Sequence, residues 1–510
     1  MKKRIIRSRR ARYGGMTVLL TVLLITVVVM TNVLFSTLAN RYYWYADMNE
    51  AMEYDLSEDC YTLIGSALAG KEADIEIIFC DTEENLLDEP MMRYIYLNAK
   101  DLEARFAGKI SVSTHDIWLD PLSVQHFNKI MDHSKGELVE TTLTVDNIIV
   151  SHGSYYRVYD RDEFYAYAQE GTSSNLWAYK GEKKLASAVL RAVEPNGAVV
   201  GITNNHGEIL SDYELLYLLD DAGYSILHFD LYSDPIPENC ELIVSYNPNS
   251  DLTVTDGSSD TSEVDKLNAF LATPGHSYLV FLGNATPTLP NMESFLASWG
   301  VETMYSKQSG RSYRYTVQDE KGSLTSDGCT VYGQLATGAG ADLLDELNGG
   351  TVFKNATALR AANGYVFNGD GSYTKGNRTM YELFVSGEKA LSWANGVPVD
   401  DSKSILFALT EQKTEGAASS YVGVCSSVEM LSEEFLQSAV YGNTDTMLQI
   451  FETVGRNRTP MGLKIKPLVS TKISTVTTAQ MWKWTLALSI TPAVVAVAAA
   501  TVILVKRKRA

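Results

Sequence analysis

Two apolar stretches, one near each end of the 510-residue chain, constrain its architecture more than any other feature of the sequence. The first spans residues 16–38, where the only polar side chains are those of Thr, Ser and one Asn. The second spans residues 482–505, with Trp482 and Trp484 at its start. At a rise of ~1.5 Å per residue, either stretch can cross a hydrocarbon layer of ~30 Å as a helix. The sequence therefore predicts two transmembrane helices.

Each stretch also has an alternative interpretation. The first could be a cleaved signal peptide, but the apolar region of a signal peptide usually has only about 7–15 residues. The second is rich in Ala and Val and contains Pro492, as a buried helix of a soluble core could. Four consecutive bases follow Val505 directly, and such a basic flank is typical of a membrane helix.

Charged residues are distributed unevenly along the chain. Residues 1–38 contain seven bases and no acid, and residues 482–510 contain five bases and no acid. Cytoplasmic flanks of membrane helices are rich in Lys and Arg, so the tails 1–15 and 506–510 are predicted to lie in the cytoplasm. Residues 39–481 are then predicted to lie outside the cell membrane.

The region between the two stretches is strongly acidic. The whole chain has 43 bases and 62 acids, a formal net charge of −19, and all the acids fall in this region with only 31 of the bases. A protein that binds nucleic acid needs a basic face to neutralise phosphates, so nucleic acid is excluded as a partner. Hydrophobic residues make up 45% of the chain, which indicates an ordered rather than a disordered protein.

Residues 39–170 are predicted to form a small α/β unit. Their pattern indicates a helix, a strand, a helix, a strand and a β-hairpin, over residues 55–68, 74–80, 91–106, 110–113 and 144–159. This order is typical of a thioredoxin-like fold. Redox chemistry of that kind needs a paired thiol of low pKa, and neither Cys60 nor Cys80 has a cysteine nearby in the sequence. The unit is therefore interpreted as a structural relative only.

The remaining outer region is predicted to contain an α/β domain that is interrupted by β-rich sequence. Residues 171–305 alternate between helices and strands, beginning with a helix at 182–192, which indicates a doubly wound parallel sheet. Residues 306–415 are rich in β-forming residues, Gly and Asn and are interpreted as a β-rich insertion. Residues 416–481 return to the α/β pattern, with a strand at 421–425, and lead into the juxtamembrane segment.

The loop His206-Gly207-Glu208 follows the first strand of the predicted parallel sheet. Ligands of such sheets bind at the carboxyl ends of the strands, so these residues are candidates for a binding site or an acid/base pair. The alternative is a turn in which Gly207 takes a positive φ and the polar side chains cap the next helix. The sequence contains no P-loop, no Gly-x-Ser-x-Gly elbow and no metal-ligand spacing of His or Cys. No catalytic residue, metal or cofactor is therefore predicted.

Five short motifs follow one another in a characteristic order. They are Tyr54-Asp55-Leu56-Ser57, Gly181-Glu182 with the helix to Ala188, His206-Gly207-Glu208, Gly442-Asn443-Thr444-Asp445 and Lys466-Pro467-Leu468. With the two apolar stretches, this order resembles the GldG-type auxiliary proteins of bacterial ABC transporters, which are known from gliding motility. Asn204-Asn205 departs from the Thr-Gly pair that is usual in that family.

The resemblance implies a central domain similar to glutamine-amidotransferase-like or flavodoxin-like folds, without a nucleophile. It also implies two partners, an ABC transporter ATP-binding subunit and a multi-helix permease. The sequence therefore predicts a non-enzymatic auxiliary subunit in the lipid bilayer, with both helices packed on the permease. Two other hypotheses stay open, an extracytoplasmic receptor for a ligand such as a carbohydrate and a hydrolase or amidotransferase-like enzyme that uses His206 and Glu208.

Overall fold

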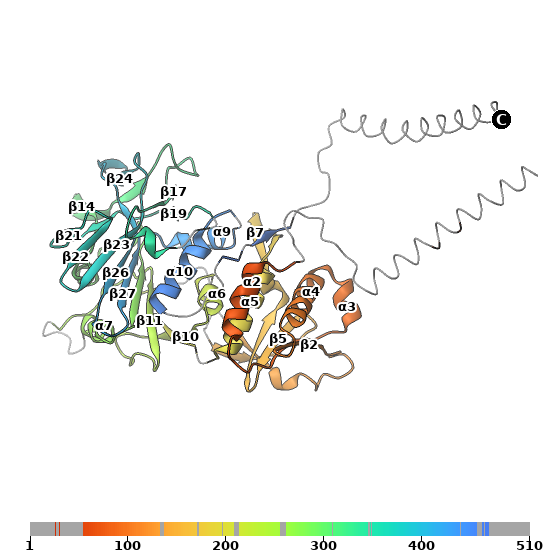
Figure 1. Cartoon of the computed structure of the whole chain (residues 1–510). Coiled ribbons are helices and arrows are strands. Elements are labelled where there is room, and N and C mark those ends of the chain that lie inside the picture. Colours follow the sequence, from red (N-terminus) through yellow and green to blue (C-terminus); the bar gives the residue numbers. More distant parts are fainter. Residues whose placement is uncertain are drawn as a thin grey trace, which may run out of the picture.

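The computed structural model describes residues 55–132, 137–170, 173–195, 197–208, 214–255, 262–308, 310–344, 347, 349–438, 440–455, 462–463 and 465–468, together with residues 26 and 30. These residues form a mixed α/β structure with several sheets, some of whose strands are parallel. Most elements coloured red to yellow gather on one side of the molecule, and most green to blue elements on the other (Figure 1). We call residues 55–195 the N-terminal unit and residues 197–455 the C-terminal unit.

The N-terminal unit is built on a six-stranded sheet with the order β2-β1-β5-β6-β3-β4. β1 and β2 are parallel and are connected through α3 and α4, whereas β5 pairs antiparallel with both β1 and β6. The bounds are β1 (Ile75–Phe79), α3 (Glu83–Asp88), α4 (Pro90–Arg105), β2 (Ile110–Thr114), β3 (Lys129–Asp132), β4 (Glu137–Glu140), β5 (Asn147–His152) and β6 (Tyr155–Asp160). The predicted strand–helix–strand unit and hairpin are confirmed, and the β3–β4 pair is an addition that the pattern did not predict.

Helix α2 (Glu58–Leu68) illustrates how local sequence fixes an element of this unit. Ser57 caps the helix, because its hydroxyl accepts a hydrogen bond from the backbone N–H of Cys60 at 3.2 Å. Glu58 and Asp59 in the first turn interact favourably with the helix dipole. The buried side chains recur with helical spacing and form one face, which consists of Cys60, Ile64, Ala67 and Leu68.

Helix α5 (Gly181–Val193) links the two units and is buried along almost its whole length. It was predicted as the first helix of the doubly wound sheet, but its apolar residues belong to the core of the N-terminal unit. Leu185, Ala188 and Val189 pack there with residues of α2, α4 and β1. Sequence periodicity gives the apolar face of a helix but not the sheet that this face covers, which explains the difference.

The C-terminal unit contains a twelve-stranded sheet whose first five strands, in the order β10-β9-β11-β12-β27, are parallel. Helices α6 and α10 contribute to the core on one face of the sheet, and α7 and α8 to the core on the other. The bounds are β9 (Val199–Thr203), α6 (Glu214–Asp221), β10 (Ser225–Phe229), β11 (Cys240–Tyr246), α7 (Glu263–Ala272), β12 (Ser277–Phe281), α8 (Pro290–Ser298), β27 (Ser420–Cys425) and α10 (Asn443–Gly455). The predicted doubly wound parallel arrangement is therefore present.

The β-rich region 306–415 continues this sheet instead of standing apart from it. Its strand β26 (Ile405–Gln412) pairs antiparallel with β27, and β23 (Arg378–Val385) pairs with β26. The sheet then ends with β22 (Ser372–Lys375) and β21 (Val366–Phe367). Smaller sheets complete the region, from β14 (Tyr305–Gln308) with β15 (Arg311–Arg314), β16 (Thr316–Gln318) with β24 (Leu391–Ala394) and β25 (Val397–Asp400), and β17 (Thr330–Tyr332) with β19 (Val352–Lys354).

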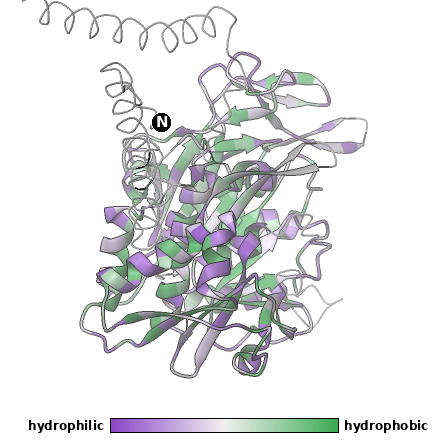
Figure 2. Cartoon of the chain, turned by 90° about the vertical axis from the view of Figure 1, so that its right-hand side faces the viewer, coloured by the Kyte–Doolittle hydropathy of each residue, from purple (hydrophilic) through white to green (hydrophobic). Residues whose placement is uncertain are grey.

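The hydropathy of the described residues follows this layered arrangement. In Figure 2, helices that face the viewer alternate between hydrophilic and hydrophobic residues, as expected for helices with one buried face. β12 lies between parallel neighbours, and all five of its residues are buried. Four of the five cysteines are buried, and all five are free thiols.

No helix among the described residues is long and apolar enough to cross a membrane. The predicted spans 16–38 and 482–505 lie outside the described residues, apart from residues 26 and 30. The two membrane helices and the cytoplasmic position of both tails therefore stay predictions.

Candidate functional site

The predicted loop His206-Gly207-Glu208 lies directly after β9, at the carboxyl edge of the parallel strands. Gly207 has a φ of +73°, as the turn interpretation required, because this conformation is unfavourable for residues with a Cβ. The backbone N–H groups of Asn249 and Ser250 donate to the carbonyl of His206 at 2.7 and 2.9 Å. The loop is thus attached to the segment that follows β11.

The imidazole of His206 lies between two carboxylates. Nδ1 is 3.3 Å from Oε1 of Glu208, and Nε2 is 3.0 Å from Oε1 of Glu263, a residue in the first turn of α7. Only 2% of His206 is exposed. Burial alone would lower the pKa of His206, but hydrogen bonds and charges of Glu208 and Glu263 outweigh burial and raise it to about 9. The ring is therefore protonated and positively charged at neutral pH.

The two carboxylates have further partners on both oxygens. Glu208 accepts hydrogen bonds from the Thr203 hydroxyl and the His206 N–H, both at 2.6 Å. Glu263 accepts from the Asn205 side chain at 2.7 Å and the Thr253 N–H at 2.8 Å. Burial opposes ionisation of Glu263, but hydrogen bonds led by that of His206 lower its pKa to about 2.

This geometry determines what the cluster can do chemically. The structure brings His206 and Glu208 together, as the acid/base hypothesis required, and it adds Glu263, which the sequence analysis did not name. A general base needs a free nitrogen within reach of substrate, whereas both nitrogens of His206 face carboxylates. The arrangement is better suited to holding the ends of β9, β11 and α7 together than to moving a proton.

A second buried cluster is centred on Glu182, in the first turn of α5. Its Oε1 accepts hydrogen bonds from both the backbone N–H and the hydroxyl of Ser57. Its Oε2 is 2.8 Å from Nζ of Lys466, and this Nζ also donates to the carbonyl of Asp55 at 2.7 Å. Glu182 is 2% exposed. One carboxylate therefore binds residues that are 125 positions before it and 284 positions after it in the chain.

A steric constraint explains the glycine at the start of α5. A Cβ atom at position 181 would lie 2.1 Å from the ring of Tyr179, so only glycine fits there. The Tyr179 hydroxyl donates to Asn98 at 2.7 Å, which holds the ring in place. The close approach of Tyr179 to Gly181 thereby fixes how the chain turns from β8 (Ser173–Tyr179) into α5.

Backbone pairing strengthens this cluster. β28 (Lys466–Pro467) is antiparallel to β8, with Lys466 opposite Tyr179, and the Leu468 N–H donates to the Trp177 carbonyl at 2.8 Å. β8 in turn forms a hairpin with β7 (Tyr165–Glu170). The segment before the second predicted span is therefore attached to the same unit as the segment after the first.

Further ion pairs of α5 reach the C-terminal unit. Nζ of Lys183 is 3.1 Å from Oδ1 of Asp445 in α10, and both side chains are buried. Nζ of Lys184 is 2.8 Å from Oδ1 of Asp221 at the end of α6. Burial would lower the pKa of Lys184, but the charges of Asp221 and Glu163 raise it well above its ordinary value. We call Asp55, Ser57, Glu182, Lys183, Asp445 and Lys466 the α5 junction.

Four of the five motifs that carried the resemblance supply the α5 junction. These motifs lie far apart in the chain, and their sequence pattern does not predict that they meet. Neither Glu182 nor Lys466 was named as a site residue, because only the position of the Tyr179 ring shows that Gly181 is required there. No protein-family model matches this chain, and no curated protein matches it either.

Proposed function

We propose that the chain is a non-enzymatic auxiliary subunit of a bacterial ABC transporter, anchored in the cell membrane by two helices. Residues 39–481 lie outside in this proposal, and both tails lie in the cytoplasm. The N-terminal unit is interpreted as thioredoxin-like, and the parallel part of the C-terminal sheet as amidotransferase-like or flavodoxin-like. The partners are a separate ATP-binding subunit and a multi-helix permease.

The α5 junction is the observation that supports this proposal most directly. Ser57 follows the first predicted span by 19 residues, and Lys466 precedes the second by 16. Both bind the same carboxylate, so the segments that lead to the two spans start from one fixed point. Such an arrangement favours two membrane helices that enter the bilayer close to each other, beside one permease.

The second predicted span offers a surface for this contact. It carries several alanines, at positions 487, 493, 496 and 498–500. Small residues let membrane helices approach each other closely, and packing drives their association because lipid supplies no hydrophobic force between them. We expect this span to contact the permease and the first span to serve mainly as an anchor.

The test uses the full-length chain, co-expressed with an ATP-binding subunit and a multi-helix permease from the same organism. Replacing residues 484–505 with leucines should preserve membrane insertion and reduce co-purification of the permease strongly. The matched control replaces residues 16–38 with leucines and should leave co-purification nearly unchanged. Failure of the natural chain to retain either partner, or catalytic turnover that is lost in His206→Ala, would contradict the proposal.

A further inference from the structure

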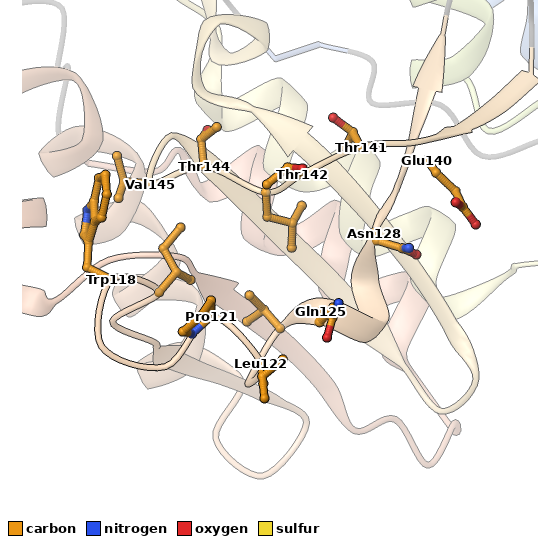
Figure 3. Close-up of a pocket in the computed structure, with 13 residues that line it drawn as sticks. Trp118, Pro121, Leu122, Gln125, Asn128, Glu140, Thr141, Thr142, Thr144 and Val145 are labelled. Atoms are coloured by element: carbon orange, nitrogen blue, oxygen red, sulfur yellow. The ribbon is translucent and has the colours of Figure 1, made fainter.

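A large groove lies on the face of the N-terminal sheet that is opposite to α5. Its volume is about 1070 Å³, just above the usual range for small-molecule sites. One wall runs along residues 117–128, which follow β2, and the other along residues 140–145, between β4 and β5. Figure 3 shows Trp118, Pro121 and Leu122 on the first wall and the threonines of the second wall across the cavity.

Both walls are held in place by the rest of the fold. Ile117 and Leu143, one from each wall, pack on a buried cluster that includes Ile78 and Ile149 of the sheet. The backbone N–H of Trp118 donates to the Asp116 side chain at 3.0 Å, and that of Leu122 to the Asp120 side chain at 3.2 Å. The groove therefore exists before a ligand binds, which reduces the entropic cost of binding.

The lining combines an aromatic surface with uncharged hydrogen-bonding groups. Trp118 is 79% exposed, a high value for a tryptophan, and Leu122 is 70% exposed. Gln125, Asn128 and Thr142 also line the groove, and within the described residues their side chains form no hydrogen bond. The polar ends of these side chains are therefore free to bind a ligand.

The charges and backbone of the groove narrow the class of ligand. Its described lining contains the carboxylate of Glu140 and no basic side chain, which disfavours phosphates and other anions. The N–H groups of Thr141 and Thr144 already donate to Asn128 and Asn147, at 2.7 Å each, so this wall cannot pair fully with an added peptide strand. A ligand must then be recognised mainly through side chains.

We propose that this groove binds a neutral oligosaccharide. Sugar rings present C–H groups on their faces and hydroxyls at their edges. The exposed ring of Trp118 suits the faces, and the amides of Gln125 and Asn128 with the Thr142 hydroxyl suit the edges. This inference is independent of the proposed transporter role, because it uses neither the α5 junction nor the predicted spans.

The test measures binding of cellotetraose and of the tetramer of N-acetylglucosamine by calorimetry, followed by a panel of other neutral glycans. The full-length chain is placed in lipid nanodiscs, because maltoside detergents carry sugars that would compete. We expect at least one neutral oligosaccharide to bind. Trp118→Ala and Asn128→Ala should each raise its dissociation constant about tenfold or more.

The matched control is Phe367→Ala, which removes an aromatic side chain that is 56% exposed on β21, in the other unit. This variant should bind the oligosaccharide like the natural chain. The absence of binding to every neutral glycan would overturn the inference, and so would binding that Trp118→Ala leaves unchanged. Trp118-dependent binding of an apolar peptide in place of glycans would identify a protein-docking groove and also overturn it.

Discussion

The His206 cluster and the α5 junction are each centred on a buried charged side chain, but they connect the chain in different ways. His206, Glu208 and Glu263 lie within 58 residues of one another in the sequence. They pair with one another at one edge of one sheet. Glu182 binds Ser57 and Lys466, which are 409 residues apart, while its neighbour Lys183 reaches the other unit. A buried charge cluster is therefore not by itself a sign of catalysis, and its partners show what it holds together.

The largest effect should follow from removing the centre of the α5 junction. Glu182→Ala leaves the ammonium of Lys466 without its carboxylate and leaves the Ser57 hydroxyl without its acceptor. Breaking a buried pair in this way costs about 3 kcal/mol in the free energy of unfolding. Denaturant unfolding of the full-length chain measures the loss. Glu194→Ala, at the exposed end of the same helix, is the control and should cost about 0.5 kcal/mol or less.

Removing the centre of the other cluster should cost less. His206→Gln can donate to only one of the two carboxylates, and we expect a loss of about 2 kcal/mol. The pH dependence of this loss of stability tests whether the imidazole is charged. Because the folded-state pKa of His206 is raised to about 9, its stabilisation is fully present below its ordinary pKa of about 6.5 and is lost as pH rises through 9.

The ionisation of Glu263 affects stability at the acidic end of the pH scale. Its pKa is lowered to about 2, so its contribution is present above its ordinary value near 4.5 and is lost as pH falls towards 2. The difference in melting temperature between the natural chain and His206→Gln should therefore be largest between about pH 4.5 and 6.5. A difference that is constant up to pH 10 would contradict the assignment of a charged His206.

A smaller effect is expected where α5 reaches the C-terminal unit. The Lys183–Asp445 pair should show a coupling energy of about 1 kcal/mol in a double-mutant cycle with Lys183→Met and Asp445→Asn. Unfolding of the full-length chain provides the four free energies. Additive effects of the two substitutions would indicate that this pair does not tie the units together.

The smallest effect concerns the reactivity of the cysteine thiols in the folded chain. Burial, aided by the charge of Glu182, raises the pKa of Cys60 to about 12, and burial raises that of Cys240 to about 12. Only Cys329, which is partly exposed, should react readily with a maleimide. In Glu182→Gln, Cys60 should become reactive while Cys240 stays protected. Reaction of both thiols would mean that the substitution opens the C-terminal unit as well as the α5 junction.

The sequence predicted elements of the fold better than it predicted how they meet. Periodicity located α2, α4 and the strands β1, β2, β5, β6 and β27, because a buried face leaves a repeating apolar pattern. It did not place α5 in the core of the N-terminal unit, nor β26 beside β27, since both depend on contacts between distant segments. The same limit applies to the sites. His206 and Glu208 are two residues apart and could be predicted as a pair, whereas Glu263, Glu182 and Lys466 become neighbours only through the tertiary fold.

Hydrogen–deuterium exchange tests the central claim most directly. This claim is that Glu182 holds residues 55–61 and residues 465–468 together at one point. The full-length chain is compared with Glu182→Gln, which preserves the size of the side chain and removes its charge. We expect residues 55–61 and 465–468 to lose protection together, while β9, β11 and β12 keep theirs. Loss of protection in only one of the two segments, or in neither, would contradict it.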